Sequence, residues 1–281
     1  MPLLADCELA VMFWAGKDPA ETLQTLVAMG VRNGQMGIPG DYRLDSAAAI
    51  EWKAAASALD FTIYTVFAAY EGESYADVSA VRNTVGLVPS ATRAARRVRT
   101  LEVALFAHEI GASAIATHIG CVPRDQESTG YRLTADAVRR ICDEAARFEL
   151  AFALETGQET APELLGFIQE VNRPNLGINF DPANMILYGT GDPVEALEIL
   201  QPLVLSVHCK DGNWPASPGA LGIEAPLGQG KVNWRKFLAQ LDKGGYREPL
   251  AIERETSDEN QRLMDIQMGL AFLRGLQLSG G

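Results

Sequence analysis

Alternating apolar and polar positions mark a short strand that runs into a polar loop at residues 203–212. In an extended chain successive side chains point to opposite faces, so Leu205 and Val207 would lie on one face and Ser206 and His208 on the other. The same alternation occurs at residues 151–155, 176–181 and 250–253. Each of these four predicted strands therefore places one polar side chain at its carboxyl end, opposite its bulky apolar residues.

Strand-like and helix-like segments alternate along the whole chain. The remaining strands are predicted at residues 7–14, 31–36, 61–69 and 113–118. Helices are predicted from Asp18, at 47–59, at 91–108, from 134, at 162–171, from Asp192, from 233 and at 258–276. Eight strand–helix units of about 35 residues each suit parallel strands joined by crossover helices. The predicted fold class is therefore α/β, a single (β/α)8 TIM barrel in which residues 1–281 form one domain.

An open, doubly wound sheet is the alternative arrangement for the same order of elements. That fold usually has a glycine-rich phosphate turn after its first strand. This chain has Ala15-Gly16-Lys17-Asp18 in that place. A closed barrel also explains why polar side chains gather at strand ends, because barrel active sites lie at the carboxyl ends of the strands.

The composition excludes several classes of protein. With 47% hydrophobic and 21% charged residues, the chain resembles an ordinary globular protein. Its formal net charge of −12 argues against nucleic-acid binding, which favours a basic surface. The first apolar stretch lacks the features of a signal peptide, and no run approaches the ~20 residues of a membrane span. Its four cysteines show no paired spacing, so we expect reduced thiols in a cytoplasmic protein.

The four strand ends would bring Glu155, Asp181, His208 and Glu253 to one rim of the barrel. Three carboxylates and one imidazole form an oxygen-rich site that suits one divalent cation, Mn²⁺ first, with Mg²⁺, Co²⁺ or Zn²⁺ as alternatives. Without a cation the converging carboxylates would repel one another. The alternative is that these acids cap helices or pair with arginine and lysine, which explains one such residue better than four at once.

Five short motifs occur in chain order: Glu155-Thr156, Asn179-Phe180-Asp181-Pro182-Ala183-Asn184, His208-Cys209-Lys210-Asp211-Gly212, Leu227-Gly228-Gln229-Gly230 and Ile252-Glu253. Together they resemble the xylose isomerase-like TIM-barrel superfamily, the sugar phosphate isomerase/epimerase group that includes D-tagatose 3-epimerase-like enzymes. The resemblance covers the whole chain. It implies a single divalent metal ion held by Glu155, Asp181, His208 and Glu253.

The resemblance also implies that Glu155 and Glu253 are the catalytic residues and approach opposite faces of a bound sugar. One would remove the proton beside the carbonyl and the other would return a proton, through a metal-stabilised enediolate. The predicted function is a metal-dependent isomerase or epimerase of carbohydrate metabolism, acting on a ketose or related keto-sugar without an organic cofactor. A metal-dependent lyase or dehydratase on a keto-sugar, keto-inositol or keto-glycoside is the alternative, since it begins with the same proton removal. A non-catalytic partner subunit is a third class.

Substrate contacts are predicted at His118, Asn184, Lys210 and Trp214. His118 ends the fourth predicted strand on the same face as its alanines, so its side chain should face the cavity. Some epimerases of the family have histidine in place of Asn184 and arginine in place of Trp214, so the particular substrate does not carry over. Lys210 either binds a substrate oxygen or pairs with a ligand carboxylate.

Other residues compete for a role. Glu255 shares its strand face with Glu253 and is the competing candidate for the same position. The arginines at helical spacing, Arg93, Arg96, Arg97 and Arg99, are predicted to form a solvated face or a subunit contact rather than a phosphate site. The expected partners are a small-molecule sugar and further copies of this chain in a dimer or tetramer, with no nucleic acid and no membrane.

Overall fold

The computed structural model describes residues 3–217 and 219–278. Within these residues, eight parallel strands close a barrel in the order β1-β10-β7-β6-β5-β4-β3-β2. The strands are β1 (Leu9–Trp14), β2 (Asn33–Ile38), β3 (Thr62–Ala68), β4 (Ala114–Thr117), β5 (Ala151–Glu155), β6 (Leu176–Phe180), β7 (Val204–Cys209) and β10 (Leu250–Ile252). The prediction of a (β/α)8 TIM barrel is confirmed, and the strand ends lie within about two residues of their predicted positions.

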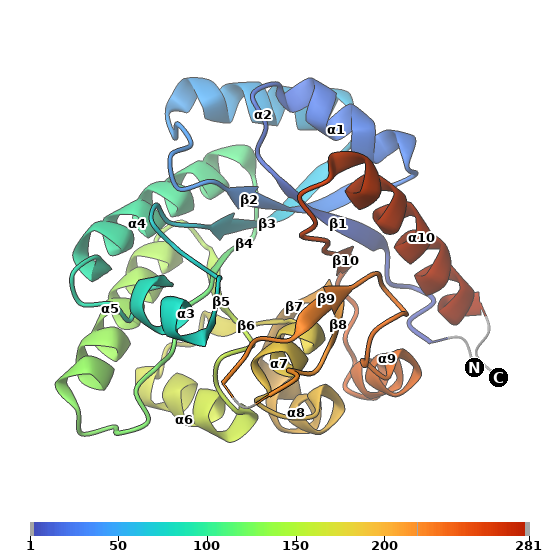
Figure 1. Cartoon of the computed structure of the whole chain (residues 1–281). Coiled ribbons are helices and arrows are strands. Elements are labelled where there is room, and N and C mark those ends of the chain that lie inside the picture. Colours follow the sequence, from blue (N-terminus) through green and yellow to red (C-terminus); the bar gives the residue numbers. More distant parts are fainter. Residues whose placement is uncertain (1–2, 218, 279–281) are drawn as a thin grey trace. The chain divides into compact units, whose positions relative to one another are not determined.

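Helices separate most of these strands (Figure 1). They are α1 (Pro19–Ala28), α2 (Ser46–Ala58), α3 (Val78–Thr84), α4 (Arg93–Ile110), α5 (Thr129–Ala146), α6 (Ala161–Val171), α7 (Pro182–Tyr188), α8 (Pro193–Leu200), α9 (Trp234–Lys243) and α10 (Glu259–Leu278). Side-chain caps decide where many of them begin: Asp18 accepts from the Glu21 amide before α1, and Asp192 does the same for α8. Proline follows the cap in both, where its missing N–H costs nothing. None of the helices in the described residues is both long and apolar enough to span a bilayer.

Contacts divide the chain into two compact units. The first unit comprises residues 3–12, 156–165, 179–217 and 219–278 of the described chain, and the second comprises residues 13–155 and 166–178. The prediction that residues 1–281 form a single domain is not tested by this division and stays a prediction.

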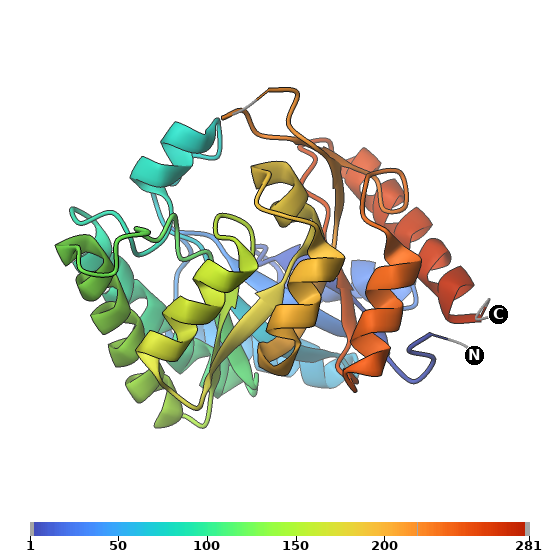
Figure 2. The ribbon, with the colours of Figure 1, turned by 90° about the horizontal axis from the view of Figure 1, so that it is seen from below.

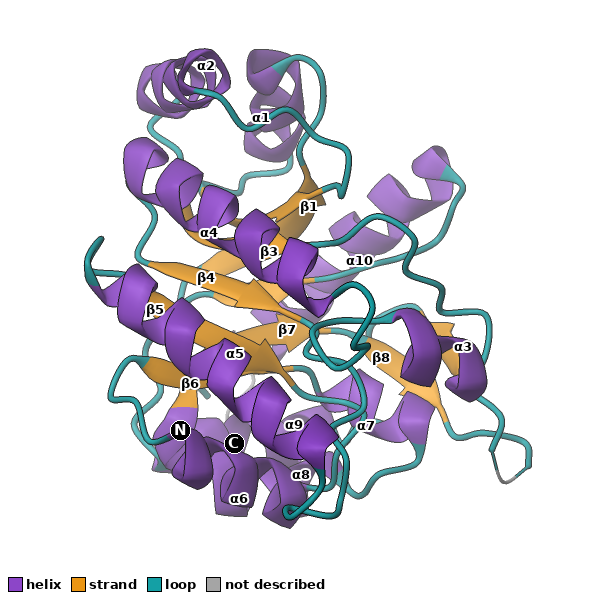
Figure 3. Ribbon diagram, turned by 90° about the vertical axis from the view of Figure 1, so that its left-hand side faces the viewer, coloured by secondary structure: helices purple, strands orange, loops and turns teal. Residues whose placement is uncertain are grey.

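In the second unit, β3 pairs in parallel with β2 and β4, and β4 pairs with β5. Helices α1, α2, α4 and α5 form a layer along one side of these strands (Figure 1). Helix α3 stands apart from that layer (Figure 2) and lies on the side toward which the arrowhead of β4 points (Figure 3). Helix α3 was not predicted from the sequence, because a seven-residue helix is too short for a clear helical periodicity.

In the first unit, β10 pairs in parallel with β1 and with β7, which places Ala251 beside His208. Helix α7 begins directly after β6. The segment between β7 and α9 was assigned neither a strand nor a helix from the sequence. It contains an antiparallel hairpin of β8 (Asp211–Asn213) and β9 (Ile223–Ala225), seen beyond the end of β7 in Figure 2. Three-residue strands leave too little alternation to be recognised in the sequence.

Candidate metal centre

Asp181 directly follows β6 and has two structural partners. Its Oδ1 atom accepts a hydrogen bond of 2.9 Å from the Asn184 amide, which makes it the N-cap of α7. The Thr156 hydroxyl accepts from the Asp181 amide at 2.8 Å and donates to the Asp181 carbonyl at 2.9 Å. The short helix therefore holds the carboxylate, and the buried threonine holds the backbone of Asp181. The Oδ2 atom lies 3.9 Å from Nδ1 of His208.

His208 and Glu253 come from neighbouring strands of the same unit. His208 lies in β7 and is fully buried, and Glu253 follows the last residue of β10. The parallel register sets Ala251 opposite His208, so Glu253 lies two residues farther along, on the same face. The His208 Nδ1 atom is 3.2 Å from Oε2 of Glu253. The pairing of β7 with β10 thus brings an imidazole and a carboxylate into contact.

Lys210 brings a positive charge next to the carboxylate of Glu253. Its ammonium group is 3.1 Å from Oε2 of Glu253, and it also pairs with Glu255. Burial lowers the pKa of Lys210, but the Glu253 and Glu255 carboxylates outweigh burial and raise that pKa well above its usual value. Of the two alternatives for Lys210, the structure shows the pairing with a carboxylate of the predicted site. The competing residue Glu255 is bound to the same lysine.

The charges near Glu253 lower the pKa of its carboxyl group, whereas those near Lys210 raise the pKa of the ammonium group. Burial alone would raise the pKa of the Glu253 carboxyl, but His208 and Lys210 outweigh burial and hold the pKa far below its usual range. Glu253 therefore carries its charge at neutral pH. A charged carboxylate is the form that binds a cation or accepts a proton.

Glu155, the last residue of β5, belongs to the second unit and is buried. Its Oε2 atom is 2.6 Å from Nε2 of His118, which follows β4. The His118 side chain is partly exposed, and its ring lies 5.6 Å from the ring of Tyr75. His118 thus contacts a predicted ligand directly, while its role as a substrate contact stays a prediction.

The four predicted ligands meet in one cluster. One ligand atom each from Glu155, Asp181, His208 and Glu253 lies within 4.8 Å of the others, and all four residues are buried. With Glu255, the group carries four carboxylates against the single ammonium of Lys210. Oxygen-rich sets with one imidazole suit Mn²⁺ and Mg²⁺, so the residues present fit a divalent cation.

Asn184 and Trp214, the other predicted substrate contacts, lie in different surroundings. Asn184 is buried in α7, and its side-chain nitrogen has no hydrogen-bond partner among the described residues. Trp214 follows β8 and is 43% exposed. A buried amide donor and an exposed aromatic ring are both able to contact a polar ligand, but their roles stay predictions.

Asp211 organises the segment after β7, a role that was not predicted from the sequence. Its carboxylate accepts hydrogen bonds from the amides of Gly212, Gly228 and Val232 and from the indole nitrogen of Trp234. The available signal was an aspartate next to a glycine in a loop, since such residues often bind nearby backbone amides.

Of the two roles predicted for the arginines of α4, the solvated face is wrong for Arg96, and the subunit contact stays a prediction. Arg96 is buried, and it donates to the Gly86 carbonyl at 2.7 Å. Arg93 donates to the Leu87 carbonyl at 2.7 Å, and Arg99 donates to the Pro39 carbonyl at 3.2 Å. Helical spacing places these residues on one face, but it does not reveal that distant loops cover that face.

Fold and cluster together define a barrel protein with an acidic, histidine-containing site at the strand ends. Residues 23–276 match the family of xylose isomerase-like TIM barrels, and the chain belongs to that family. Among solved structures, a xylose isomerase domain protein from Planctomyces limnophilus is 39% identical, with a TM-score of 0.92 over 96% of this chain and 97% of its own.

More distant structures share the fold. A xylose isomerase-like TIM barrel protein from Mycobacterium smegmatis in complex with magnesium is 17% identical, with a TM-score of 0.72 over 99% of both chains. A D-psicose 3-epimerase from Clostridium cellulolyticum H10, solved with D-tagatose, is 15% identical, with a TM-score of 0.70 over 96% of this chain and 99% of its own. A D-tagatose 3-epimerase-like protein, a 3-keto-D-glucoside 4-epimerase from E. coli and a probable 3-DHS dehydratase from Bacillus anthracis are 16%, 16% and 18% identical, with TM-scores of 0.70, 0.70 and 0.69.

One curated relative, the uncharacterised protein YihM of Escherichia coli K12, is 33% identical over 102 residues. The matched part covers 36% of this chain and 31% of the relative. The chain thus spans about a third of the length of this relative in the alignment.

Proposed function

We propose that this protein is a divalent-metal-dependent epimerase or isomerase of a ketose or a related keto-sugar. The observation that carries the proposal is the buried cluster of Glu155, Asp181, His208 and Glu253, with ligand atoms within 4.8 Å of one another. The epimerases among proteins of the same fold support the sugar as substrate class. A dehydratase of that fold supports the lyase as the competing reaction.

The four clustered residues would hold the cation. Three carboxylates gathered in a buried site repel one another, and a divalent cation removes much of that cost. When bound, such a cation polarises a substrate carbonyl and stabilises the negative charge that develops when the neighbouring carbon loses its proton. We expect Mn²⁺ or Mg²⁺ in this role, because the donor set is mostly oxygen.

The two glutamates would move the proton. His118 bonds the Glu155 carboxylate through Oε2, and Lys210 pairs with Oε2 of Glu253. Each carboxylate is thus oriented by a nitrogen partner, as a positioned acid or base requires. For epimerisation, one glutamate removes the proton from the carbon beside the carbonyl, and the other returns a proton to the opposite face.

The test is turnover with exchange of solvent deuterium. The chelated protein is reloaded with Mn²⁺ and assayed in D₂O against D-tagatose, D-allulose, D-fructose and a 3-keto-glucoside. An epimerase places one deuterium on the inverted carbon without losing water or an aglycone. Release of water or aglycone with no epimer would replace the proposal by the lyase, and absence of all exchange would overturn it.

Two variants test the division of roles. Glu155→Gln and Glu253→Gln each keep a coordinating oxygen but remove the group that titrates, so turnover should fall by roughly 10²–10⁴. Each variant should still exchange the proton of one epimer and not that of the other. A Glu253→Gln protein that interconverts epimers at the wild-type rate would rule out the pair and direct attention to Glu255.

A further inference from the structure

Tyr75 is an exposed aromatic residue of the second unit, in the segment between β3 and α3. The residue is 45% exposed, and its ring lies 5.6 Å from the ring of His118, with an angle of 54° between the planes. His118 in turn lies 2.6 Å from the buried carboxylate of Glu155. The three side chains therefore form a series from solvent to the predicted catalytic carboxylate, and Tyr75 is its outer member.

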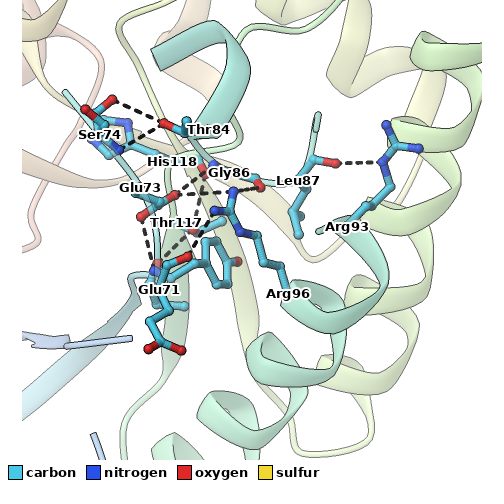
Figure 4. A network of polar contacts seen from close by, with 12 residues as sticks. Glu71, Glu73, Ser74, Thr84, Gly86, Leu87, Arg93, Arg96, Thr117 and His118 are labelled. Atoms are coloured by element: carbon cyan, nitrogen blue, oxygen red, sulfur yellow. Dashed lines mark hydrogen bonds and ion pairs between the residues drawn. The ribbon is translucent and has the colours of Figure 1, made fainter. Parts of the chain in front are cut away.

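The residues just before Tyr75 are fixed by side-chain hydrogen bonds (Figure 4). The Glu73 carboxylate accepts from the amides of Tyr70 at 3.1 Å and Gly86 at 2.7 Å. The Ser74 amide donates to the Thr84 hydroxyl at 2.9 Å. Burial raises the pKa of Glu73, while these amide bonds, His118 and Arg96 act against that rise. An exposed tyrosine thus follows two anchored residues.

Arg96 closes the segment from the side of α4 (Figure 4). Its guanidinium donates to the carbonyls of Gly86 at 2.7 Å and Glu71 at 3.3 Å, and it lies 4.0 Å from Oε1 of Glu73. It also lies over the ring of Tyr70, 5.3 Å from the centroid. One buried cation therefore joins both ends of the segment at residues 70–86.

The far end of this segment is bonded to the residue that follows His118. The Leu87 amide donates to the Ile119 carbonyl at 2.7 Å. Gly86 has a φ of +72°, and a Cβ atom there would lie 2.1 Å from the Ile119 backbone, so only glycine permits this approach. The loop after β3 and the loop after β4 are consequently held together, which fixes Tyr75 relative to His118.

A loop that only joins β3 to α4 would not need a buried carboxylate and a buried guanidinium such as those of Glu73 and Arg96. Burying a carboxylate and a guanidinium costs free energy unless both are well hydrogen-bonded, and surface loops rarely contain such pairs. These hydrogen bonds hold the backbone just before Tyr75, whose ring lies beside His118. A tyrosine ring offers a flat apolar surface and a hydroxyl, which suits the mixed polar and apolar surface of a sugar.

We propose that Tyr75 forms an aromatic wall of the sugar site and is a specificity-determining residue, with Glu73 and Arg96 as positioning residues that hold it against His118. The part that concerns sugar binding rests on the proposed function. The part that concerns positioning rests only on the contacts above. Two experiments separate these parts.

The first experiment follows the ring resonances of the histidines by NMR in metal-free protein. The chain has three histidines, His108, His118 and His208, which are assigned with His108→Gln and His118→Gln. Tyr75→Ala removes the neighbouring ring, so the His118 resonance should move while that of His208 stays in place. Glu73→Gln and Arg96→Lys should move the His118 resonance as well, because they release the tyrosine.

Leu105→Ala is the matched control, since Leu105 lies on α4 and is also 45% exposed. It should leave all three resonances unchanged. If Glu73→Gln and Arg96→Lys both fold and the His118 resonance keeps its wild-type chemical shift, the positioning role of Glu73 and Arg96 is overturned.

The second experiment measures KM and kcat with the Mn²⁺-loaded protein and D-tagatose, or the sugar of the panel with the highest kcat/KM. Tyr75→Ala should raise KM about 2- to 12-fold, as expected for the loss of one aromatic contact, with kcat changed less. Tyr75→Phe keeps the ring and loses only the hydroxyl, so it should raise KM less than Tyr75→Ala does, and Leu105→Ala should change neither constant. The ratio of activities between two epimers should also change in Tyr75→Ala.

The two experiments separate a failure of the role of Tyr75 from a failure of the proposed function. An unchanged KM in Tyr75→Ala, or a loss of melting temperature alone, would assign Tyr75 to packing. If the wild type turns over no sugar of the panel, the proposed function fails and the specificity role fails with it. The His118 resonance would then still decide whether Glu73 and Arg96 hold the tyrosine.

Discussion

Asp181 uses its two carboxylate oxygens for different purposes. The Oδ1 atom caps α7 through the Asn184 amide, and the Oδ2 atom faces His208 in the ligand cluster. The cap restricts the side-chain rotamer, so the helix positions the second oxygen before any cation arrives. Residues held in this way make more precise sites than residues on free loops.

Two substitutions of Asp181 should separate these purposes. Asn is also a good helix cap, so Asp181→Asn should keep the stability of the metal-free protein but lower metal affinity well over ~10-fold. Asp181→Ala should lose the metal and, in addition, about 1 kcal/mol of unfolding free energy in the metal-free protein. Calorimetric titration with Mn²⁺ and urea unfolding of the chelated protein measure the two effects.

Asp192 provides the control, because it caps α8 and is absent from the cluster. Asp192→Ala should lose a similar amount of stability without a change in metal affinity. Wild-type metal affinity in Asp181→Asn would remove Asp181 from the ligand set.

The cysteines should differ sharply in reactivity. Burial raises the pKa of Cys7 to about 11 and that of Cys142 to about 12, and burial also raises the pKa of Cys209. Since the thiolate is the reactive form, a raised pKa leaves these three thiols protonated and inert at pH 8. Cys121 is partly exposed. Ellman's reagent at pH 8 should therefore label about one thiol per folded chain and all four in guanidinium.

Cys121→Ser identifies that thiol, because its folded form should show no fast reaction. A fast reaction that persists in Cys121→Ser would mean that one of the buried cysteines becomes exposed by local opening.

At the scale of elements, Asp211 fastens the segment between β7 and α9. The four donors to its carboxylate come from Gly212, Gly228, Val232 and Trp234, which span both ends of the β8–β9 hairpin. Asp211→Asn replaces one acceptor oxygen by an N–H₂ donor that faces other donors. We expect a loss of ~2–3 kcal/mol of unfolding free energy and faster amide exchange in residues 223–232.

Asp258→Asn is the comparison for Asp211→Asn, because Asp258 caps the Gln261 amide at the surface and asparagine caps equally well. Hydrogen exchange followed by mass spectrometry should show no change in that variant. If Asp211→Asn leaves exchange in residues 223–232 unaltered, the hairpin is held by its packing and not by Asp211.

The long elements were predictable because each has a local signal. Strands β5, β6 and β7 alternate small or polar residues with bulky ones, and helices α1 and α8 begin with aspartate and proline. The clustering of the four predicted ligands was predictable for the same reason: parallel strands end at one rim, so polar residues at the strand ends are brought together.

What the sequence could not show depends on partners far away in the chain. Arg96 is buried because residues 70–86 cover its face of α4, and nothing in the spacing of the arginines reveals that loop. The pairing of Lys210 with Glu253 depends on the register of β7 with β10. Short elements such as α3 and β8 show too little periodicity to be recognised, and their partners lie elsewhere in the chain: the Thr84 hydroxyl of α3 accepts from the Ser74 amide, and β8 pairs with β9.

At the scale of the whole molecule, the closed order of the strands affects how cooperatively the chain unfolds. The first compact unit contains β7 and β10, and the second contains β2 to β5. Each alone would leave unpaired strand edges, which are costly in water and prone to aggregate. We therefore expect one cooperative transition on heating, with equal calorimetric and van't Hoff enthalpies. Two resolved transitions in scanning calorimetry would contradict the prediction of a single domain.

Metal binding should stabilise the folded chain as a whole. The four predicted ligands lie far apart in the sequence, so a metal site made by them would exist only in the folded protein and its binding free energy would add to stability. At a Mn²⁺ concentration about 100 times Kd, the gain is ~2.7 kcal/mol, which for a chain of this length corresponds to a rise in Tm of roughly 4–5 °C. Asp181→Asn should abolish most of that rise, while Asp192→Ala should retain it. A Tm of the chelated wild type that does not respond to Mn²⁺, Mg²⁺, Co²⁺ or Zn²⁺ would show that the cluster binds no divalent cation, and the proposed reaction would lose its Lewis acid.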